Sequence, residues 1–299
     1  MRILFIIPLL FSLSASCQKI TINKPGKPST VTINAPGKGS SVKITVPDHT
    51  PPEDELNNEF NTNEAGQQLF VIIGNSIARG TSEGVGPTPT AGTVYEWNGS
   101  AVVEVEDEDL INANTGSPWP HMGMDYYTSK TLKPVFSASG SGGADFANPG
   151  DNNYWSTGGT LYPAMKTKVN NALTELGVTR PRGIIMILGI NDARAATDLG
   201  DVEDAITDVF DKLESDWPDT RIYVVNIGRE AAGYSTTRIN AIRGYLTNEV
   251  NARANVFFAF DLRTYAVDIP AYYSGDNLHL TQAGNDALGE AIATFLISN

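Results

Sequence analysis

From about residue 67 to the C-terminus, short apolar runs alternate with longer amphipathic stretches. Five runs of mostly apolar residues predict buried strands, at 69–73, 134–138, 183–188, 221–227 and 255–260. Apolar residues spaced three or four positions apart predict helices between and after them, at 162–176, 202–217, 236–250 and 282–298. Strands separated by helices of this length are typical of βαβ units. We therefore expect residues 67–299 to form a three-layer α/β/α domain around a mostly parallel, five-stranded sheet.

One segment, residues 81–132, interrupts this alternation. It contains two short β-type runs, at 93–97 and 101–105, on either side of Asn98-Gly99. Asn-Gly between two such runs is a strong signal for a β-hairpin. We expect a hairpin here in addition to the five strands.

The N-terminus has the pattern of an export signal. Arg2 precedes an apolar run at 3–13, and three small residues then lead to Cys17. The run is shorter than the ~20 residues that a membrane helix needs, so we predict a signal peptide at 1–16. The position of Cys17 resembles that of the acylated cysteine in bacterial lipoproteins, and an ordinary secretory signal is the alternative. Either way we expect an exported protein: a cell-surface or periplasmic lipoprotein, touching a membrane only through its N-terminal lipid, or otherwise a secreted protein.

Residues 17–47 contain a repeated, lysine-rich pattern. A short alternating run followed by proline recurs at 20–27, 31–38 and 43–47, and Pro-Gly closes the first two copies. These runs hold too few large apolar residues to fold stably alone, which favours an extended or β-rich stalk. A small β-module that docks on the domain or on polysaccharide is the alternative. The acidic, proline-containing stretch at 48–66 predicts a linker.

Charge and composition exclude several functions. The chain of 299 residues has 21 basic and 34 acidic side chains, a net charge of −13. This balance argues against a nucleic-acid partner, because such proteins need a basic surface to neutralise phosphates. With one cysteine and three histidines, the chain has no material for an internal disulfide and little for a metal site. We expect neither a metal nor an organic cofactor.

Four groups of small polar residues follow the predicted strands or precede the last helix. In chain order they are Gly74-Asn75-Ser76, Ser141-Gly142, Gly189-Ile190-Asn191-Asp192 and Asp276-Asn277-Leu278-His279. Reactive groups of α/β proteins collect at the carboxyl ends of the strands, so we expect these groups to meet there. Ser76, His279 and Asp276 would then supply a nucleophile, a base and a group that orients the base. The backbone amides of Ser76 and Gly142 and the side chain of Asn191 would supply oxyanion donors.

Taken singly, each group has an ordinary structural explanation, such as a helix cap or a turn. Together and in this order, they resemble the SGNH hydrolase superfamily, the GDSL-type esterases and lipases, over residues 69–297. The resemblance implies a flavodoxin-like fold, a catalytic triad of Ser76, Asp276 and His279, and an oxyanion hole of Ser76, Gly142 and Asn191. Gly140 and Gly143, which flank Gly142 at one or two positions, are alternatives for the glycine donor. Asn75 stands where the family name has aspartate, a position outside the triad.

The resemblance also implies a substrate class, because exported bacterial members often remove O-acetyl groups from polysaccharide. We therefore expect a serine esterase that hydrolyses short acyl esters on carbohydrate, or another small ester, through an acyl-enzyme. Four aromatic residues in the long connecting segments could stack on a sugar or could simply pack: Trp97, Trp119, Tyr154 and Trp155. Two alternatives remain open: a lipase or lysophospholipase, which the polar inserted segments and the acidic run at 106–109 disfavour, and a carbohydrate-binding module without turnover.

Overall fold

The computed structural model describes residues 29–34, 41–46 and 61–299, except 83, 106–109, 111–112, 114, 149, 151, 196 and 229–233. It divides into two compact units, 1–59 with 299, and 60–298. In the first unit, β1 (Ser29–Asn34) and β2 (Ser41–Val46) form an antiparallel pair in which Ser29 lies opposite Val46. These strands overlap the second and third copies of the repeat. The signal segment, Cys17, the first copy and linker residues 48–60 lie outside the described residues.

The second unit is built on a seven-stranded sheet with the order β5-β4-β6-β3-β7-β8-β9. All neighbouring strands are parallel except β4 and β5. The strands are β3 (Gln67–Gly74), β4 (Tyr95–Trp97), β5 (Val102–Glu104), β6 (Lys133–Ala138), β7 (Gly183–Ile187), β8 (Arg221–Asn226) and β9 (Val256–Asp261). The predicted α/β class and mostly parallel sheet are confirmed.

The sheet has seven strands rather than the five expected, because the hairpin joins it. Tyr95 of β4 pairs with Val135 of β6 in parallel register, and β5 lies outside β4. The hairpin turn is held by Asn98, whose side-chain oxygen accepts hydrogen bonds from the amides of Ser100 and Ala101. The added strands cover the backbone edge that β6 would otherwise expose.

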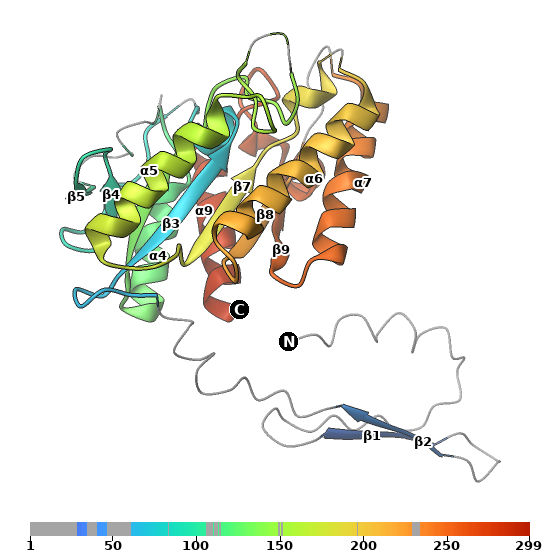
Figure 1. Ribbon diagram of the computed structural model, residues 1–299, viewed down its shortest axis with the longest axis horizontal. Helices are drawn as coiled ribbons and strands as arrows, with labels where there is room; N and C mark the ends of the chain where they lie inside the picture. Colours follow the sequence, from blue (N-terminus) through green and yellow to red (C-terminus); the bar gives the residue numbers. More distant parts are fainter. Residues whose placement is uncertain are drawn as a thin grey trace. The chain divides into compact units, whose positions relative to one another are not determined.

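Helices cover both faces of this sheet (Figure 1). One face packs against α5 (Leu161–Leu176), α6 (Leu199–Asp216) and α7 (Thr236–Ala252), and the other against α4 (Trp119–Lys130) and α9 (Gln282–Ser298). Shorter elements lie at the strand ends: α3 (Ser76–Arg79), α8 (Arg263–Asp268), and the single turns η1 (Asn191–Ala193) and η2 (Pro270–Tyr272). None of the helices in the described part of the chain is long and apolar enough to cross a membrane.

Side chains of the central strand β3 alternate between the two cores. Leu69, Val71 and Ile73 pack towards α5 and α6, whereas Phe70 and Ile72 pack towards α4 and α9. All five side chains are fully buried. A strand covered on both faces needs apolar residues at successive positions, which explains the unbroken apolar run in the sequence.

The order of the central strands positions the functional site. β3 lies between β6 and β7, with Ile72 opposite Ala138 and Gly74 opposite Ile187. The segments that follow these three strands therefore leave the sheet side by side, at the carboxyl ends of the strands. They carry three of the four polar groups identified in the sequence.

Candidate active site

Ser76 is the first residue of α3, directly after the central strand. A side chain at Gly74 would not fit, because an added Cβ would lie 1.9 Å from the carbonyl oxygen of Ile187 on β7. The buried Asn75 side chain caps the helix by accepting a hydrogen bond from the amide of Ile77 at 3.0 Å. This tight turn leaves Ser76 half-buried at the edge of the sheet.

The structure brings Ser76, His279 and Asp276 into one hydrogen-bonded chain. Ser76 Oγ lies 2.8 Å from His279 Nε2, although the two residues are 203 positions apart in the sequence. His279 Nδ1 lies 2.5 Å from Asp276 Oδ2. A hydroxyl, an imidazole and a carboxylate connected in this order can pass a proton from the hydroxyl to the ring.

A closed turn holds Asp276 in place. The amide of Ser274 donates to the carbonyl of His279 at 2.8 Å, and Asn277 has a left-handed backbone with φ of 60°. Partial burial by itself would raise the pKa of Asp276, but hydrogen bonds outweigh that effect and hold the pKa well below its ordinary value. They come from the Ser274 hydroxyl, the amide of Leu278, and the imidazole and amide of His279. The carboxylate therefore stays ionised across the physiological range.

The loop after β6 lies against the nucleophile segment. The amide of Ser141 donates to the carbonyl of Gly74 at 3.0 Å. A Cβ at Gly140 would lie 2.3 Å from the backbone nitrogen of Arg79, whereas a Cβ at Gly142 would meet nothing closer than 3.7 Å. Gly140 is thus required by packing, and Gly142 has space above it that a ligand can approach.

Asn191 starts the η1 turn after β7. Its Nδ2 donates to the carbonyl of Ala144 at 3.0 Å, and its Oδ1 accepts from the hydroxyl of Tyr234 at 3.4 Å. These two contacts fix the orientation of the amide. Nδ2 keeps a second hydrogen atom for another acceptor, because a side-chain amide has two N–H donors.

The model of the GDSL-like lipase/acylhydrolase family matches residues 70–292 of this chain. The chain belongs to this family. Membership indicates ester hydrolysis as the general activity of the chain. The matched residues cover nearly all of the second unit. No curated protein sequence matches the chain.

Two solved structures resemble that of this GDSL-like hydrolase. A protein from Arabidopsis thaliana has a TM-score of 0.61 and 17% sequence identity, over 78% of this chain and 98% of that one. NanS has a TM-score of 0.60 and 12% identity, over 78% of this chain and 97% of that one. At these identities, the likeness shows that the fold is shared.

Several residues of this GDSL-like hydrolase that support the site could not be recognised from the sequence. Asn153 bridges the loop after β6, since it accepts from Ser141 Oγ at 2.8 Å and donates to the Gly142 carbonyl at 3.0 Å. Ser274 lies two positions before Asp276 and looks like any other turn residue. The contacts of Asn153 join residues 11 and 12 positions apart, so no short sequence motif identifies them.

Asp192, next to Asn191, organises the neighbouring loop. Its fully buried carboxyl accepts hydrogen bonds from the amide of Phe146 at 2.9 and 3.0 Å and from that of Ala147 at 3.2 Å. Burial, reinforced by the nearby Asp145, raises the pKa of Asp192 to about 8. From the other side, Arg238 donates to the Asp192 carbonyl at 2.9 Å. The turn that carries Asn191 is therefore fixed by its neighbour.

A small cavity is lined by sequence neighbours of the site residues, although Ser76, His279 and Asp276 do not line it themselves. Its volume is about 10 Å³, room for roughly one water-sized group. The residues that line it flank the site residues in sequence: Asn75 and Ile77 on either side of Ser76, Ile190 before Asn191, and Leu278 before His279. Ile187, Ile227, Leu262 and Tyr273 complete a mostly apolar wall together with Gly228.

The aromatic residues proposed as sugar-stacking groups do not serve that purpose. Trp97, Trp119, Tyr154 and Trp155 are all buried, with at most 9% of their surface exposed. They pack into the core, which is the alternative that the sequence left open. The acidic run at 106–109 lies outside the described residues. Among the residues that are described, no group of histidine, cysteine and carboxylate side chains could hold a metal ion.

Proposed function

We propose that this protein hydrolyses esters of short acyl groups, above all acetyl esters of carbohydrates, through an acyl-serine intermediate on Ser76. The proposal depends on one observation: the continuous chain from Ser76 Oγ to His279 and from His279 to Asp276, with contacts of 2.8 and 2.5 Å. In this proposal Ser76 is the nucleophile, His279 the general base and Asp276 the group that orients the ring.

The reaction proceeds in two balanced steps. His279 takes the proton of Ser76 while Oγ attacks the ester carbonyl, and the negative charge that develops on the carbonyl oxygen is met by amides. The donors are the backbone amides of Ser76 and Gly142 and the Nδ2 group of Asn191. The alcohol leaves with the proton from His279. In the second step His279 takes a proton from water as the water oxygen attacks the acyl-serine, and it returns that proton to Ser76 Oγ as the bond from the acyl carbon to Oγ breaks and the carboxylic acid is released.

In this proposal the acyl group of the ester enters the small cavity, whose walls include the sequence neighbours of Ser76. A volume of about 10 Å³ has room for a group of roughly the size of water and none for a long alkyl chain. A second hollow supports a hydroxylated alcohol, because its wall includes the polar side chains of Arg79, Ser139 and Ser141.

Chromogenic esters test the proposal. The wild type should hydrolyse p-nitrophenyl acetate at a higher kcat/KM than the decanoate, and Ser76→Ala should lower kcat on the acetate by about 10⁴-fold or more. Ser298→Ala removes an exposed hydroxyl at the end of α9, which donates to the Thr294 carbonyl at 2.9 Å, and serves as the control. Equal rates for the wild type and Ser76→Ala would overturn the proposal. In that case a binding module on the same fold would be favoured, and a preference for decanoate would favour a lipase.

We also propose that the exported protein is held at a membrane by acylation of Cys17. Cys17→Ser should move the protein from the membrane fraction to the soluble fraction. An unchanged distribution would overturn the lipid anchor.

A further inference from the structure

A second hollow of about 360 Å³ is lined by Arg79, the last residue of α3, and by the loop after β6. We call it the cationic hollow and define it by Arg79, Ser139, Gly140, Ser141 and Lys168, with apolar residues of α5 completing its wall. Its volume falls in the range of small-molecule sites. Of the described residues that line it, two are cationic and none is acidic.

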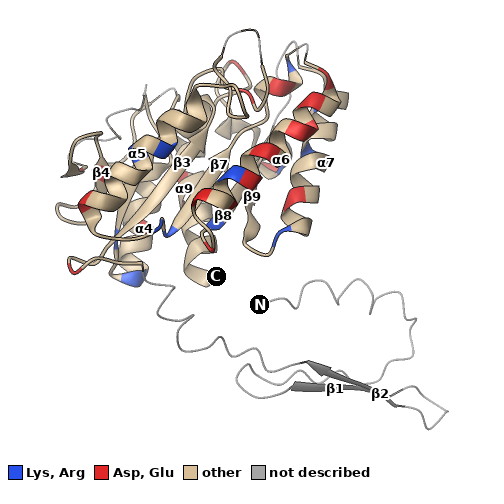
Figure 2. Ribbon diagram, in the orientation of Figure 1, with Lys and Arg blue, Asp and Glu red and all other residues tan. Residues whose placement is uncertain are grey.

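This charge stands out on an acidic protein. The net charge of the chain is −13, and Figure 2 shows acidic residues along much of α6. Two cations that share one concave surface attract an anion, because a concave, partly desolvated wall strengthens the local potential. The cationic hollow therefore favours anionic ligands, which the acidic protein as a whole repels.

The cationic hollow adjoins the candidate active site. Arg79 lies three residues after Ser76 on the same short helix, about 5 Å along the helix axis. Gly140 packs against the backbone of Arg79, and Ser141 donates to the Gly74 carbonyl at 3.0 Å. The guanidinium lies by Gly142, since a Cβ on that glycine would lie 3.7 Å from Arg79 Nη1. One small molecule can thus reach both Ser76 and Arg79.

Two further groups in the hollow are poised for a ligand. Lys168 Nζ donates to the Ala138 carbonyl at 2.6 Å and, as an ammonium, carries further N–H donors. Burial lowers the pKa of Lys168, an effect that the charge of Glu96 opposes, so a bound anion would stabilise the ammonium. Ser139 Oγ is buried and makes no hydrogen bond in the described structure. A buried hydroxyl without a partner is costly, and rotation of the Ser139 side chain would let it meet a ligand oxygen.

We propose that the cationic hollow binds the carboxylate of an acidic sugar whose acetyl ester reacts at Ser76. Arg79 is the main partner, because a guanidinium matches a carboxylate with two parallel N–H groups. Lys168 and Ser139 contact the same end of the sugar. This inference rests on the proposed function and narrows it, from acetylated carbohydrates in general to those that carry a negative charge near the ester.

The test compares an O-acetylated uronic acid glycoside with its primary amide, which has nearly the same shape, carries no charge and replaces one acceptor oxygen by an N–H donor group. We expect the kcat/KM of the wild type, measured by acetate release, to be at least about tenfold higher for the acid than for the amide. Arg79→Gln should reduce this acid-to-amide ratio about tenfold, whereas Arg79→Lys, which keeps the charge, should retain more of it. Because each ratio is measured on one variant, a loss of folded protein does not alter it.

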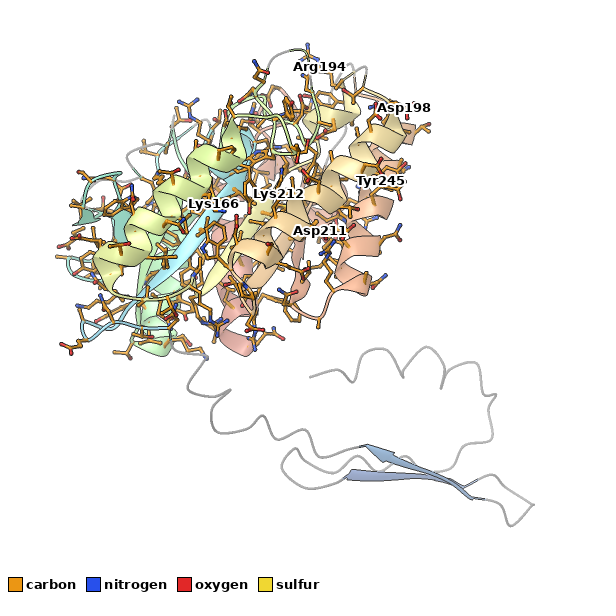
Figure 3. All side chains as sticks on the ribbon, viewed as in Figure 1. Lys166, Arg194, Asp198, Asp211, Lys212 and Tyr245 are labelled. Atoms are coloured by element: carbon orange, nitrogen blue, oxygen red, sulfur yellow. The ribbon has the colours of Figure 1, made fainter. Side chains whose placement is uncertain are left out.

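Lys166→Gln is the matched control. Lys166, labelled in Figure 3, lies on the same helix as Lys168, but its Nζ lies 2.6 Å from Asp216 Oδ1 on α6 and it does not line the hollow. Its removal also costs one positive charge and should leave the ratio at the wild-type value. A ratio that falls equally in both variants would show an effect of net charge and overturn the assignment.

Three other outcomes also test the assignment. A wild-type ratio near 1, with p-nitrophenyl acetate still hydrolysed, contradicts the carboxylate site while leaving the esterase intact. If the wild type does not hydrolyse p-nitrophenyl acetate, the proposed function itself is contradicted. Calorimetry on Ser76→Ala then tests the carboxylate site separately: the site predicts binding of the unacetylated acid and no binding of its amide. Faster release from an acetylated sugar sulfate than from the uronic acid would identify sulfate as the preferred group.

Discussion

The hydroxyl of Ser274 donates a 2.6 Å hydrogen bond to Oδ1 of Asp276, on the oxygen opposite the one that meets His279. The same Oδ1 accepts from the amides of Leu278 and His279 at 2.8 and 2.9 Å. This oxygen is therefore fully used within the turn. The carboxylate cannot rotate without breaking these bonds, so Oδ2 is held towards the imidazole.

We expect Ser274→Ala to lower kcat/KM on a short-chain acetate by about 3- to 10-fold. A hydrogen bond to a charged group contributes roughly 1.5–3 kcal/mol, and part of that contribution orients the carboxylate in the reaction. Steady-state kinetics at neutral pH measures the effect, and the KM should change less than the kcat. An unchanged kcat would show that the two backbone amides suffice to hold Asp276.

The depressed pKa of Asp276 predicts how stability depends on pH. The folded pKa lies below the unfolded value of about 3.9, so ionised Asp276 stabilises the fold fully above about pH 4. This contribution declines as the pH falls towards the folded pKa. The difference in Tm between the wild type and Asp276→Asn should therefore be largest from pH 5 to 7 and should shrink towards pH 3. Thermal unfolding across that range measures it, and a difference that grows in acid would contradict the assignment.

The sequence predicted those parts of the fold that depend on local pattern. Each of the five strands is a mostly apolar run, buried at nearly every position in β3, β6, β7 and β8 and partly buried in β9, and such runs are visible without any structure. The helix α4 was missed, because Pro120 and Gly123 interrupt its pattern and Trp119, Met122 and Tyr126 are all buried. Apolar spacing cannot reveal a helix whose sequence contains residues that usually end one.

In the candidate active site, too, short local motifs could be predicted from the sequence and long-range contacts could not. The four polar groups are short and local, so the sequence contains them in full. The contact between Ser76 and His279 depends on the strand order and on the turn at 274–279, which bring together residues 203 positions apart. The aromatic residues could not be assigned from the sequence, because a tryptophan in a connecting segment can equally face a ligand or the core. Here Trp155 is fully buried.

Asp192 predicts a second, opposite pH dependence. Its folded pKa of about 8 lies above the unfolded value of about 3.9, so its neutral form is favoured in the fold and its ionisation destabilises the protein as the pH rises. The Tm of the wild type should fall more steeply between pH 5 and 9 than that of Asp192→Asn, whose amide oxygen can still accept from Phe146. Asp201→Asn, on the exposed surface of α6, should keep the wild-type slope. Parallel slopes for the wild type and Asp192→Asn would show that Asp192 does not carry the effect.

The small cavity predicts which residue limits the length of the acyl group. Ile227, directly after β8, lines the cavity, and Ile222, on β8, does not; both residues have at most 2% of their surface exposed. Either change to alanine removes the same atoms and should cost a similar 2–5 kcal/mol of stability, roughly, by leaving a void. Only Ile227→Ala enlarges the small cavity, so it should raise the butyrate-to-acetate ratio of kcat/KM by about tenfold, since each buried methylene is worth about 0.8 kcal/mol and butyrate adds two. If Ile222→Ala raises the ratio as much, general loosening of the fold determines acyl length, and the small cavity does not.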